Sequence, residues 1–385
     1  MLIAVAVSIP IIVLSYFFVA EKNQNIEFTR AELDGTQYLR PLRKLMTDVA
    51  AHRDLASTVL AGDGSYAGEL DKASAAIDED LKAVAAQQGK NELAAAEDLE
   101  SVRADWQTLK SKLPTYKLDQ SFDQHTRYLT KVLQFSALIA NESNLVLDSD
   151  VDSHYLVDAL VFKIAKLDAE ISAGRAIGAA YLASGGQGQQ GSSRKGELAA
   201  ASVKINDALY ETNHFIRFAA GKSHPRTEAA LATAITEAGK ATSAFTTLLA
   251  ERVVNGTGEL LPVKDYLAAA GAPLDATAKL WVATVAELDR LLGERSAALQ
   301  RSVELEIVVV GLAMLFTVGF LFLVARAITL PIKHLSEVAD RISLGDLDAS
   351  IQINTRDEIG ELGERFRRMQ VSLRDAMEAL ERHGS

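Results

Sequence analysis

The sequence contains no cysteine, and it has few prolines (7 in 385 residues) and few aromatic residues (6%). Without cysteine there is no disulfide framework, zinc–thiolate site, iron–sulfur cluster or cysteine nucleophile. The formal charge of −11 argues against a general nucleic-acid-binding surface. Alanine, leucine and charged residues dominate instead, which is typical of helices that pack through small side chains. We therefore expect an all-α protein.

Two apolar runs carry no charged residue, residues 2–20 and residues 307–325, each 19 residues long. At about 1.5 Å per residue, each run covers roughly 28 Å as a helix, about the thickness of a bilayer core. The first could be a cleaved signal peptide, but it lacks a basic n-region and exceeds the usual apolar length of about 7–15 residues. We predict transmembrane helices at 1–20 and 304–325, and so a two-pass membrane protein.

Basic residues beside the second run predict the orientation. Arg326, Lys333 and Arg341 follow it within 16 residues, which places the C-terminal part in the cytoplasm. Residues 21–303, with 31 basic and 38 acidic residues, then lie outside. The prediction is a membrane protein with a large domain on the outer side of the membrane.

Residues 21–303 show apolar side chains at helical spacing and no strand-like alternation. Glycine, proline and polar breakers divide the segment. We expect helices at 22–61, 66–88, 90–112, 119–147, 153–184, 197–220, 225–253 and 274–325, with a short one at 263–270.

A weak internal repeat groups these helices. The pattern of Lys44, Leu45, Asp48, Arg53 and Leu60 returns 122 residues later as Lys166, Leu167, Glu170, Arg175 and Leu182. Two repeats of about four helices predict two four-helix modules, stacked along the membrane normal. Chance similarity between two helices rich in alanine and leucine remains the alternative.

The cytoplasmic tail carries the most specific pattern. After Pro331 comes an amphipathic helix, then the connector start Gly345-Asp346-Leu347, then Asp357-Glu358-Ile359-Gly360. The second helix repeats apolar residues at steps of 3 and 4, a heptad seam that needs a partner helix to cover it. A parallel dimer forming a four-helix coiled coil is the expected solution.

Residues 326–378 resemble the HAMP linker of bacterial transmembrane receptors. The resemblance implies that Pro331, Leu347, Ile351 and Glu358 set the packing of two alternative bundle states and so relay the signal. The whole chain resembles the sensory half of a methyl-accepting chemotaxis receptor, and its outer segment is closest in size to the helical bimodular class. Residues 379–385 then begin an output module that the sequence does not include.

The resemblance implies a homodimeric, two-pass receptor of the bacterial inner membrane, whose periplasmic sensor domain binds a small solute and which signals to cytoplasmic proteins. Two alternatives stay open. The chain could be the sensory half of a histidine kinase or diguanylate cyclase, or it could sense a partner protein or the state of the membrane.

Arginine is the best candidate for solute binding, because an acidic domain needs focal cations to hold an anion. Arg53 and Arg175 lie within helices among small residues, and the guanidinium fork suits a carboxylate or nitrate. Each could instead form a structural ion pair. The neighbouring His52 could be a pH-sensitive donor or an ordinary surface histidine.

Other motifs favour no chemistry. Asp148, Asp150 and Asp152 start like a calcium loop, but Ser153 and Ala159 occupy the positions of the required glycine and glutamate, so helix capping is the better interpretation. The glycine-rich run 185–196 lacks the ending of a phosphate-binding loop. We find no catalytic constellation, metal site or cofactor motif, and we expect a binding protein rather than an enzyme.

Overall fold

The computed structural model describes residues 2–88, 95–148, 150–186, 191–222, 225–256, 259–353 and 355–384, and within these residues it contains helices and no strand. The all-α prediction is confirmed. The chain forms two compact units, one of residues 24–299 and one of residues 1–23 with 300–385. Each unit is described by itself.

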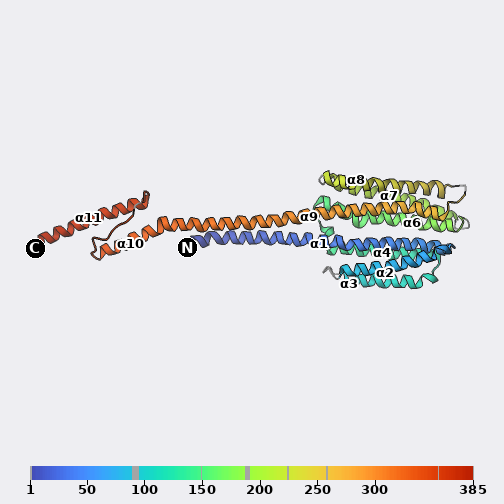
Figure 1. The fold of residues 1–385 in the computed structure, drawn as a ribbon, viewed down its shortest axis with the longest axis horizontal. Helices are drawn as coiled ribbons and strands as arrows, with labels where there is room; N and C mark the ends of the chain where they lie inside the picture. The colour runs from blue at the N-terminus through green and yellow to red at the C-terminus, as the bar shows by residue number, and fades with distance from the viewer. Residues whose placement is uncertain are drawn as a thin grey trace. The chain divides into compact units, whose positions relative to one another are not determined.

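Residues 24–299 form two antiparallel four-helix modules (Figure 1). The first module contains the outer part of α1 (Leu2–Leu60), then α2 (Ala67–Gln88), α3 (Ala96–Lys112) and α4 (Leu118–Glu142). The second contains α5 (Val151–Asp158), η4 (Ala159–Lys163), α6 (Ile164–Ala183), α7 (Gly191–Lys222), α8 (Pro225–Leu248), η5 (Leu249–Val254) and the first part of α9 (Val263–Val324).

The two modules lie side by side, with α1 and α4 of the first facing α6 and α9 of the second (Figure 1). The predicted end-to-end stacking was therefore wrong. Polar contacts join the modules along their length: Arg40 Nη2 lies 2.5 Å from Asp289 of α9, and Arg53 Nη2 donates to Ser172 of α6 at 2.9 Å. Buried residues recur along the outer part of α1, from Ile26 onward, because this part lies against both modules.

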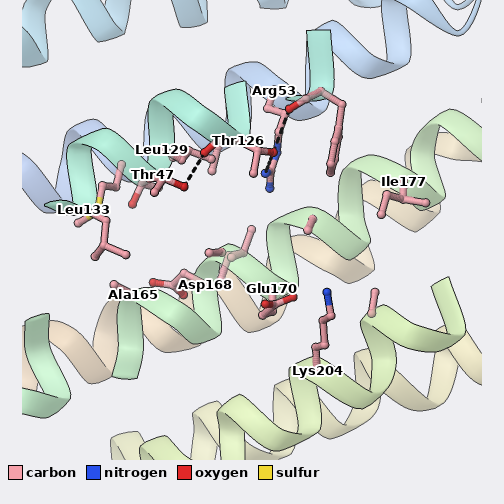
Figure 2. A pocket seen from close by; sticks show the side chains of 18 of the residues that line it. Thr47, Arg53, Thr126, Leu129, Leu133, Ala165, Asp168, Glu170, Ile177 and Lys204 are labelled. Atoms are coloured by element: carbon pink, nitrogen blue, oxygen red, sulfur yellow. Dashed lines mark hydrogen bonds between the residues drawn. The ribbon is translucent and has the colours of Figure 1, made fainter. Parts of the chain in front are cut away.

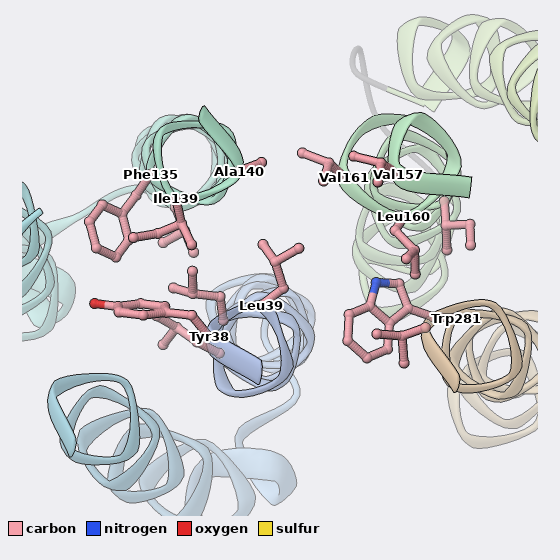
Figure 3. Close-up of a cluster of buried hydrophobic side chains, with 14 of the residues drawn as sticks. Tyr38, Leu39, Phe135, Ile139, Ala140, Val157, Leu160, Val161 and Trp281 are labelled. Carbon is pink, nitrogen blue, oxygen red and sulfur yellow. The ribbon is translucent and has the colours of Figure 1, made fainter. Parts of the chain in front are cut away.

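The main apolar core crosses the boundary between the modules. Tyr38 and Leu39 of α1 meet Phe135 and Ile139 of α4, while Trp281 of α9 closes the same cluster from the second module (Figure 3). A second cluster within the second module centres on Leu167, Ile205, Phe245, Leu249 and Tyr266. Burial of apolar surface thus binds the modules to each other.

The predicted break at residues 271–273 does not occur, because α9 runs unbroken from Val263 to Val324 with Pro273 inside it. Proline removes one helical hydrogen bond and crowds the preceding turn. Pro273 is buried, and Ala276 and Leu280 one and two turns later belong to the apolar core. Packing of this face holds the helix together across a residue that would end an isolated helix.

The other unit contains α10 (Leu330–Ser343), which η6 (Ala325–Thr329) precedes, and α11 (Glu358–Gly384). A connector joins α10 and α11. Its buried residues Ala349, Ile351 and Ile353 pack with Leu335, Val338 and Ile342 of α10. This small core fixes the connector against the first helix.

Among the described residues, one helix is long and apolar enough to cross a membrane, Val263–Ser343, and its apolar stretch is not buried in the protein. This helix contains the predicted span at 304–325. The predicted span at 1–20 is helical from Leu2 and leaves large side chains such as Leu14 and Phe17 exposed, but among the described residues it is not found as a second helix of this kind.

Candidate functional site

A cavity with a volume of about 580 Å³ lies between the two modules. Residues of α1 and α4 line one wall, residues of α6 and α7 line the other, and Leu274 of α9 completes it. Figure 2 shows Arg53 on the first wall, with Glu170 and Lys204 on the second. Of the three predicted ligand residues, only Arg53 lines this cavity.

Arg53 is the most buried charged group of the cavity, with 2% of its surface exposed. Its Nη1 donates to Thr126 Oγ1 at 3.0 Å and its Nη2 to Ser172 Oγ at 2.9 Å, while Phe122 lies under the guanidinium with its ring centre 4.9 Å away. Its Nε is buried and has no hydrogen-bond partner. Burial lowers the pKa of Arg53, opposed by Asp54 and Glu170.

Arg175 does not reach the cavity, because it pairs with a buried carboxylate. Its Nη1 lies 3.2 Å from Asp54 Oδ2, and Ser172 donates to Asp54 Oδ1 at 3.3 Å. Burial raises the pKa of Asp54 to about 6, although Arg175 and Arg53 lower it. The structure therefore brings the two repeated arginines together around Ser172, with Arg175 in an ion pair and Arg53 held by hydroxyl groups.

His52 is buried in the core of the first module. His52 Nδ1 lies 2.7 Å from His125 Nε2, and its Nε2 lies 2.8 Å from Ser74 Oγ. The Trp106 ring packs edge to face against the His52 ring, with the two ring centres 5.1 Å apart. Burial lowers the pKa of His52 to about 3 and that of His125 to about 4, so both rings are neutral at ordinary pH. The interpretation of His52 as a surface histidine was wrong.

Four charged groups line the second wall: Asp168, Glu170, Glu197 and Lys204. Glu170 is half-buried and Lys204 is exposed, and neither has an ion-pair partner within 4 Å among the described residues. Glu197 lies 3.5 Å from Arg194 Nη1, at the entrance to a smaller neighbouring cavity of about 350 Å³. At the other end, Arg43 pairs with Asp168.

Sequence reasoning missed Thr126, Glu170 and Lys204 as cavity residues, and it missed Ser172 as a hydrogen-bond partner of Arg53. The repeat contained a signal, since it aligned Arg53 with Arg175 and so pointed to α1 and α6. It could not show that these two helices face each other, because that depends on the side-by-side packing of the modules. Phe122 and Thr126 lie on α4, where no motif marks them.

Two of the three acidic residues of the rejected calcium motif, Asp148 and Asp150, lie beside one arginine. Arg295 Nη2 lies 3.0 Å from Asp148 and 2.7 Å from Asp150, and its Nη1 lies 3.3 Å from Glu32. Asp150 occupies the N-cap position of α5 without a capping hydrogen bond from its side chain. Within the described residues, no group of three or more histidine or acidic side chains is placed to hold a metal ion.

Burial raises the pKa of Glu32 to about 8, with Asp148 and Asp150 adding to the rise and Arg295 opposing it. Glu32 Oε1 is buried without a hydrogen-bond partner. A single guanidinium does not compensate three carboxylates, so Glu32 takes up a proton more readily than an ordinary carboxyl group.

The C-terminal unit places the four predicted relay residues at structural junctions. Pro331 lies in the first turn of α10, directly after the π-helical turn η6. Ile351 is buried in the connector core, and Leu347 packs half-buried against it while its carbonyl accepts from Gln370 Nε2 at 2.8 Å. Glu358 is exposed as the first residue of α11, where a negative charge favours the helix dipole.

The start of α11 is built around Asp357. Its carboxylate accepts hydrogen bonds from Ile359 N at 3.2 Å and Gly360 N at 3.1 Å, as an N-cap does. A Cβ atom on Gly360 would lie 1.9 Å from the Thr355 carbonyl oxygen, so only glycine fits there. At the other end of the connector, Gly345 has a φ of +97°, which glycine adopts without strain.

This arrangement of helix, extended connector with buried side chains and glycine-tight second helix coincides with a known family. Residues 323–375 match the HAMP domain. This part of the chain is a HAMP domain. The match begins and ends three residues before the predicted limits of 326–378, and it confirms the resemblance seen in the sequence.

The curated relatives are signalling proteins. The methyl-accepting chemotaxis protein McpA of Bacillus subtilis is 38% identical over 90 residues, 23% of this chain and 14% of the relative. A putative sensory transducer protein of Acetivibrio thermocellus is 38% identical over 76 residues, which are 20% of this chain and 14% of the relative. The sensor protein SrrB of Staphylococcus aureus is 34% identical over 64 residues, which are 17% of this chain and 11% of the relative.

The chain therefore spans about a seventh of the length of the first two relatives that it matches. No solved structure matches the chain. Together, the HAMP domain and these relatives support a signal transducer of the methyl-accepting chemotaxis type.

Proposed function

We propose that this protein is a two-pass receptor of the bacterial inner membrane whose periplasmic modules bind a small solute and whose HAMP domain relays the signal to a cytoplasmic output module in chemotaxis. The observation that carries the proposal is the continuity of one helix. The chain of α9 enters an exposed apolar stretch, passes through η6 and continues as α10 of the HAMP domain.

The cavity at Arg53 supports solute sensing over the two rival stimuli, a partner protein and the membrane itself. A well-packed domain without a cavity near either arginine would have favoured those rivals. Instead, about 580 Å³ of space lies beside a buried cation, which is within the range of small-molecule sites.

An unpartnered apolar face supports a homodimer. Leu362, Met369 and Leu373 of α11 are 40–43% exposed, while Ile359 and Phe366 pack on the connector core of the same chain. The exposed residues follow a spacing of seven and four, which fits a partner helix of a coiled coil. A second copy of the chain would cover them.

The identity of the output is a separate matter. A relative named sensor protein stands beside those named chemotaxis proteins, so a histidine kinase or cyclase output remains the second candidate function. The choice depends on which output module receives the signal from the HAMP domain.

Single cysteines test the membrane topology without background, because the chain contains none. We expect Ser192→Cys, in the second module, to react with a membrane-impermeant maleimide in cells with an intact inner membrane. Ser350→Cys, in the HAMP connector, should react only after the inner membrane is permeabilised. Equal labelling of both variants before permeabilisation would overturn the two-pass proposal.

A further inference from the structure

We propose that the cavity between the modules takes an amphiphilic monoanion, a single carboxylate carried on an apolar body, with the carboxylate at Arg53. This inference rests on the proposed solute-sensing function and names the class of solute. Three features of the cavity lead to it: a buried cation without an ion pair, a set of unpaired lining charges that sum to +1, and otherwise apolar walls.

The first feature is the state of Arg53. Both of its hydrogen-bond acceptors, Thr126 and Ser172, are neutral hydroxyl groups, and its buried Nε has none. Its neighbour Asp54 is engaged by Arg175 at 3.2 Å. A guanidinium that is 98% buried loses hydration, and hydroxyl groups replace only part of it. An incoming carboxylate would supply the missing negative charge.

The second feature is the balance of charge around the cavity. Arg43 pairs with Asp168, and Glu197 pairs with Arg194, which lies outside this lining and also pairs with Asp119. The six charged lining residues sum to zero, but the three without an ion pair among the described residues, Arg53, Lys204 and Glu170, carry one net positive charge. A monoanion neutralises this charge. A dianion would place its second charge against Glu170, and a cation would meet two positive groups.

The third feature is the apolar surface between these charges. The remaining lining consists largely of aliphatic, aromatic and alanine side chains: Met46, Ala50, Phe122, Leu129, Leu133, Ala165, Ala169, Ala173, Ile177, Ala200, Ala201 and Leu274. An inorganic anion or a small dicarboxylate would leave this surface in contact with water. An apolar body removes this surface from water, which favours binding.

The experiment measures binding of 4-phenylbutyrate to the full chain in lipid nanodiscs by calorimetry. Three compounds run beside it: the neutral isostere 4-phenylbutyramide, the small dianion succinate, and nitrate. We expect 4-phenylbutyrate to bind about tenfold or more tightly than the amide, because the amide lacks the charge that Arg53 requires.

Three variants locate the binding site. Arg53→Gln should weaken binding of 4-phenylbutyrate at least about tenfold, and Ala173→Leu should do the same by filling the cavity without changing its charge. Arg127→Gln is the matched control, since Arg127 is exposed on α4 next to Thr126 and does not line the cavity. It should bind within about twofold of the unchanged protein.

Three outcomes overturn the inference. Equal binding of the amide would show an apolar site without charge selection. Unchanged binding in both Arg53→Gln and Ala173→Leu would place the ligand elsewhere. Binding of succinate or nitrate without binding of 4-phenylbutyrate would reject the amphiphilic class and leave solute sensing intact, whereas binding of none of the compounds would count against both.

Discussion

Charged and titratable side chains buried in the sensor modules are compensated to very different degrees. Asp54 has Arg175 as an ion-pair partner, Arg53 has only hydroxyl groups, and Glu32 shares one arginine with two other carboxylates. An uncompensated buried charge costs free energy that a proton or a ligand can recover. For Arg53 the compensating group is an anion, and for Glu32 it is a proton.

The raised pKa of Glu32 predicts that the folded protein loses stability as the pH rises from about 4.5 to about 8. Below pH 4.5 the Glu32 carboxyl group is protonated in both the folded and the unfolded chain, so it does not reduce the stability of the fold. Between pH 4.5 and 8 the unfolded chain loses this proton more readily than the folded chain, which lowers the free energy of unfolding. Above pH 8 the carboxylate is charged in the folded chain as well, and the loss is complete. The melting temperature of Glu32→Gln should show a smaller decline over this range, whereas exposed Glu27→Gln should behave like the unchanged protein. Parallel curves for all three proteins would contradict the assignment.

The lowered pKa values of His52 and His125 predict the opposite trend at acidic pH. The unfolded chain takes up protons at these rings below about pH 6.5, while the folded chain resists protonation down to about pH 4 and below. Stability contributed by the neutral pair is therefore present above pH 6.5 and is lost as the pH falls. In the Glu32→Gln background, the melting temperature should fall as the pH drops below about 6.5, and His52→Gln should reduce this fall. His214→Gln, at an exposed site, should leave it unchanged, and an equal effect of both histidine variants would refute the prediction.

At the scale of single residues, the sequence identified Arg53 as a candidate ligand-binding residue but did not identify the residues around it. Arginine among small residues signals room for a ligand, and this holds for Arg53. The same signal selected Arg175, which the structure places in an ion pair with Asp54. The difference depends on which residue of a neighbouring helix faces each arginine, and no helical periodicity of a single segment contains that information.

Single helices were predicted well where the apolar spacing is regular and poorly where packing overrides a local signal. The expected helices at 66–88 and 225–253 closely match α2 and α8 with η5. Pro273 was expected to end a helix and does not, since the buried face of α9 holds it. The π-helical turns η4, η5 and η6 have no signature in the apolar pattern.

The connector and its flanking helices in the HAMP domain predict a division of labour between relay and binding. Pro331→Ala would restore a backbone donor beside η6, and Glu358→Ala would remove a charge from the start of α11. We expect both changes to alter signalling output while the affinity of the sensor modules for their solute stays within about twofold. A loss of solute affinity in either variant would show that the HAMP residues take part in binding.

At the scale of the whole molecule, the sequence predicted the two modules and the HAMP domain, but not how the modules pack. Helix length and a repeat suggested stacking, because a helix of 40 residues is about 60 Å long. The observed side-by-side arrangement follows from which faces carry Trp281, Leu160 and Leu39, since these meet in one core. Such pairing of faces across modules is a property of the folded chain.

The exposed seam of α11 predicts a contact between two copies of the chain. Leu373→Cys should form a disulfide between copies on mild oxidation, because Leu373 lies on the seam with Leu362 and Met369. Ser372→Cys, one residue earlier and about 100° around the helix, should cross-link much less. Equal cross-linking at both positions would indicate random collision rather than a coiled-coil dimer.

The π-helical turn η6 has a mechanical consequence for the junction that it occupies. A π turn accommodates one more residue than an α turn, so the five residues Ala325–Thr329 store a change of helical register. Conversion of this turn to α geometry would rotate α10 by about 100° and displace it by about 1.5 Å relative to the end of α9. The junction thus couples a small shift of α10 along its axis to a large rotation, which changes the face of α10 that packs on the connector. A chain with one of these five residues deleted would keep the rotated register permanently.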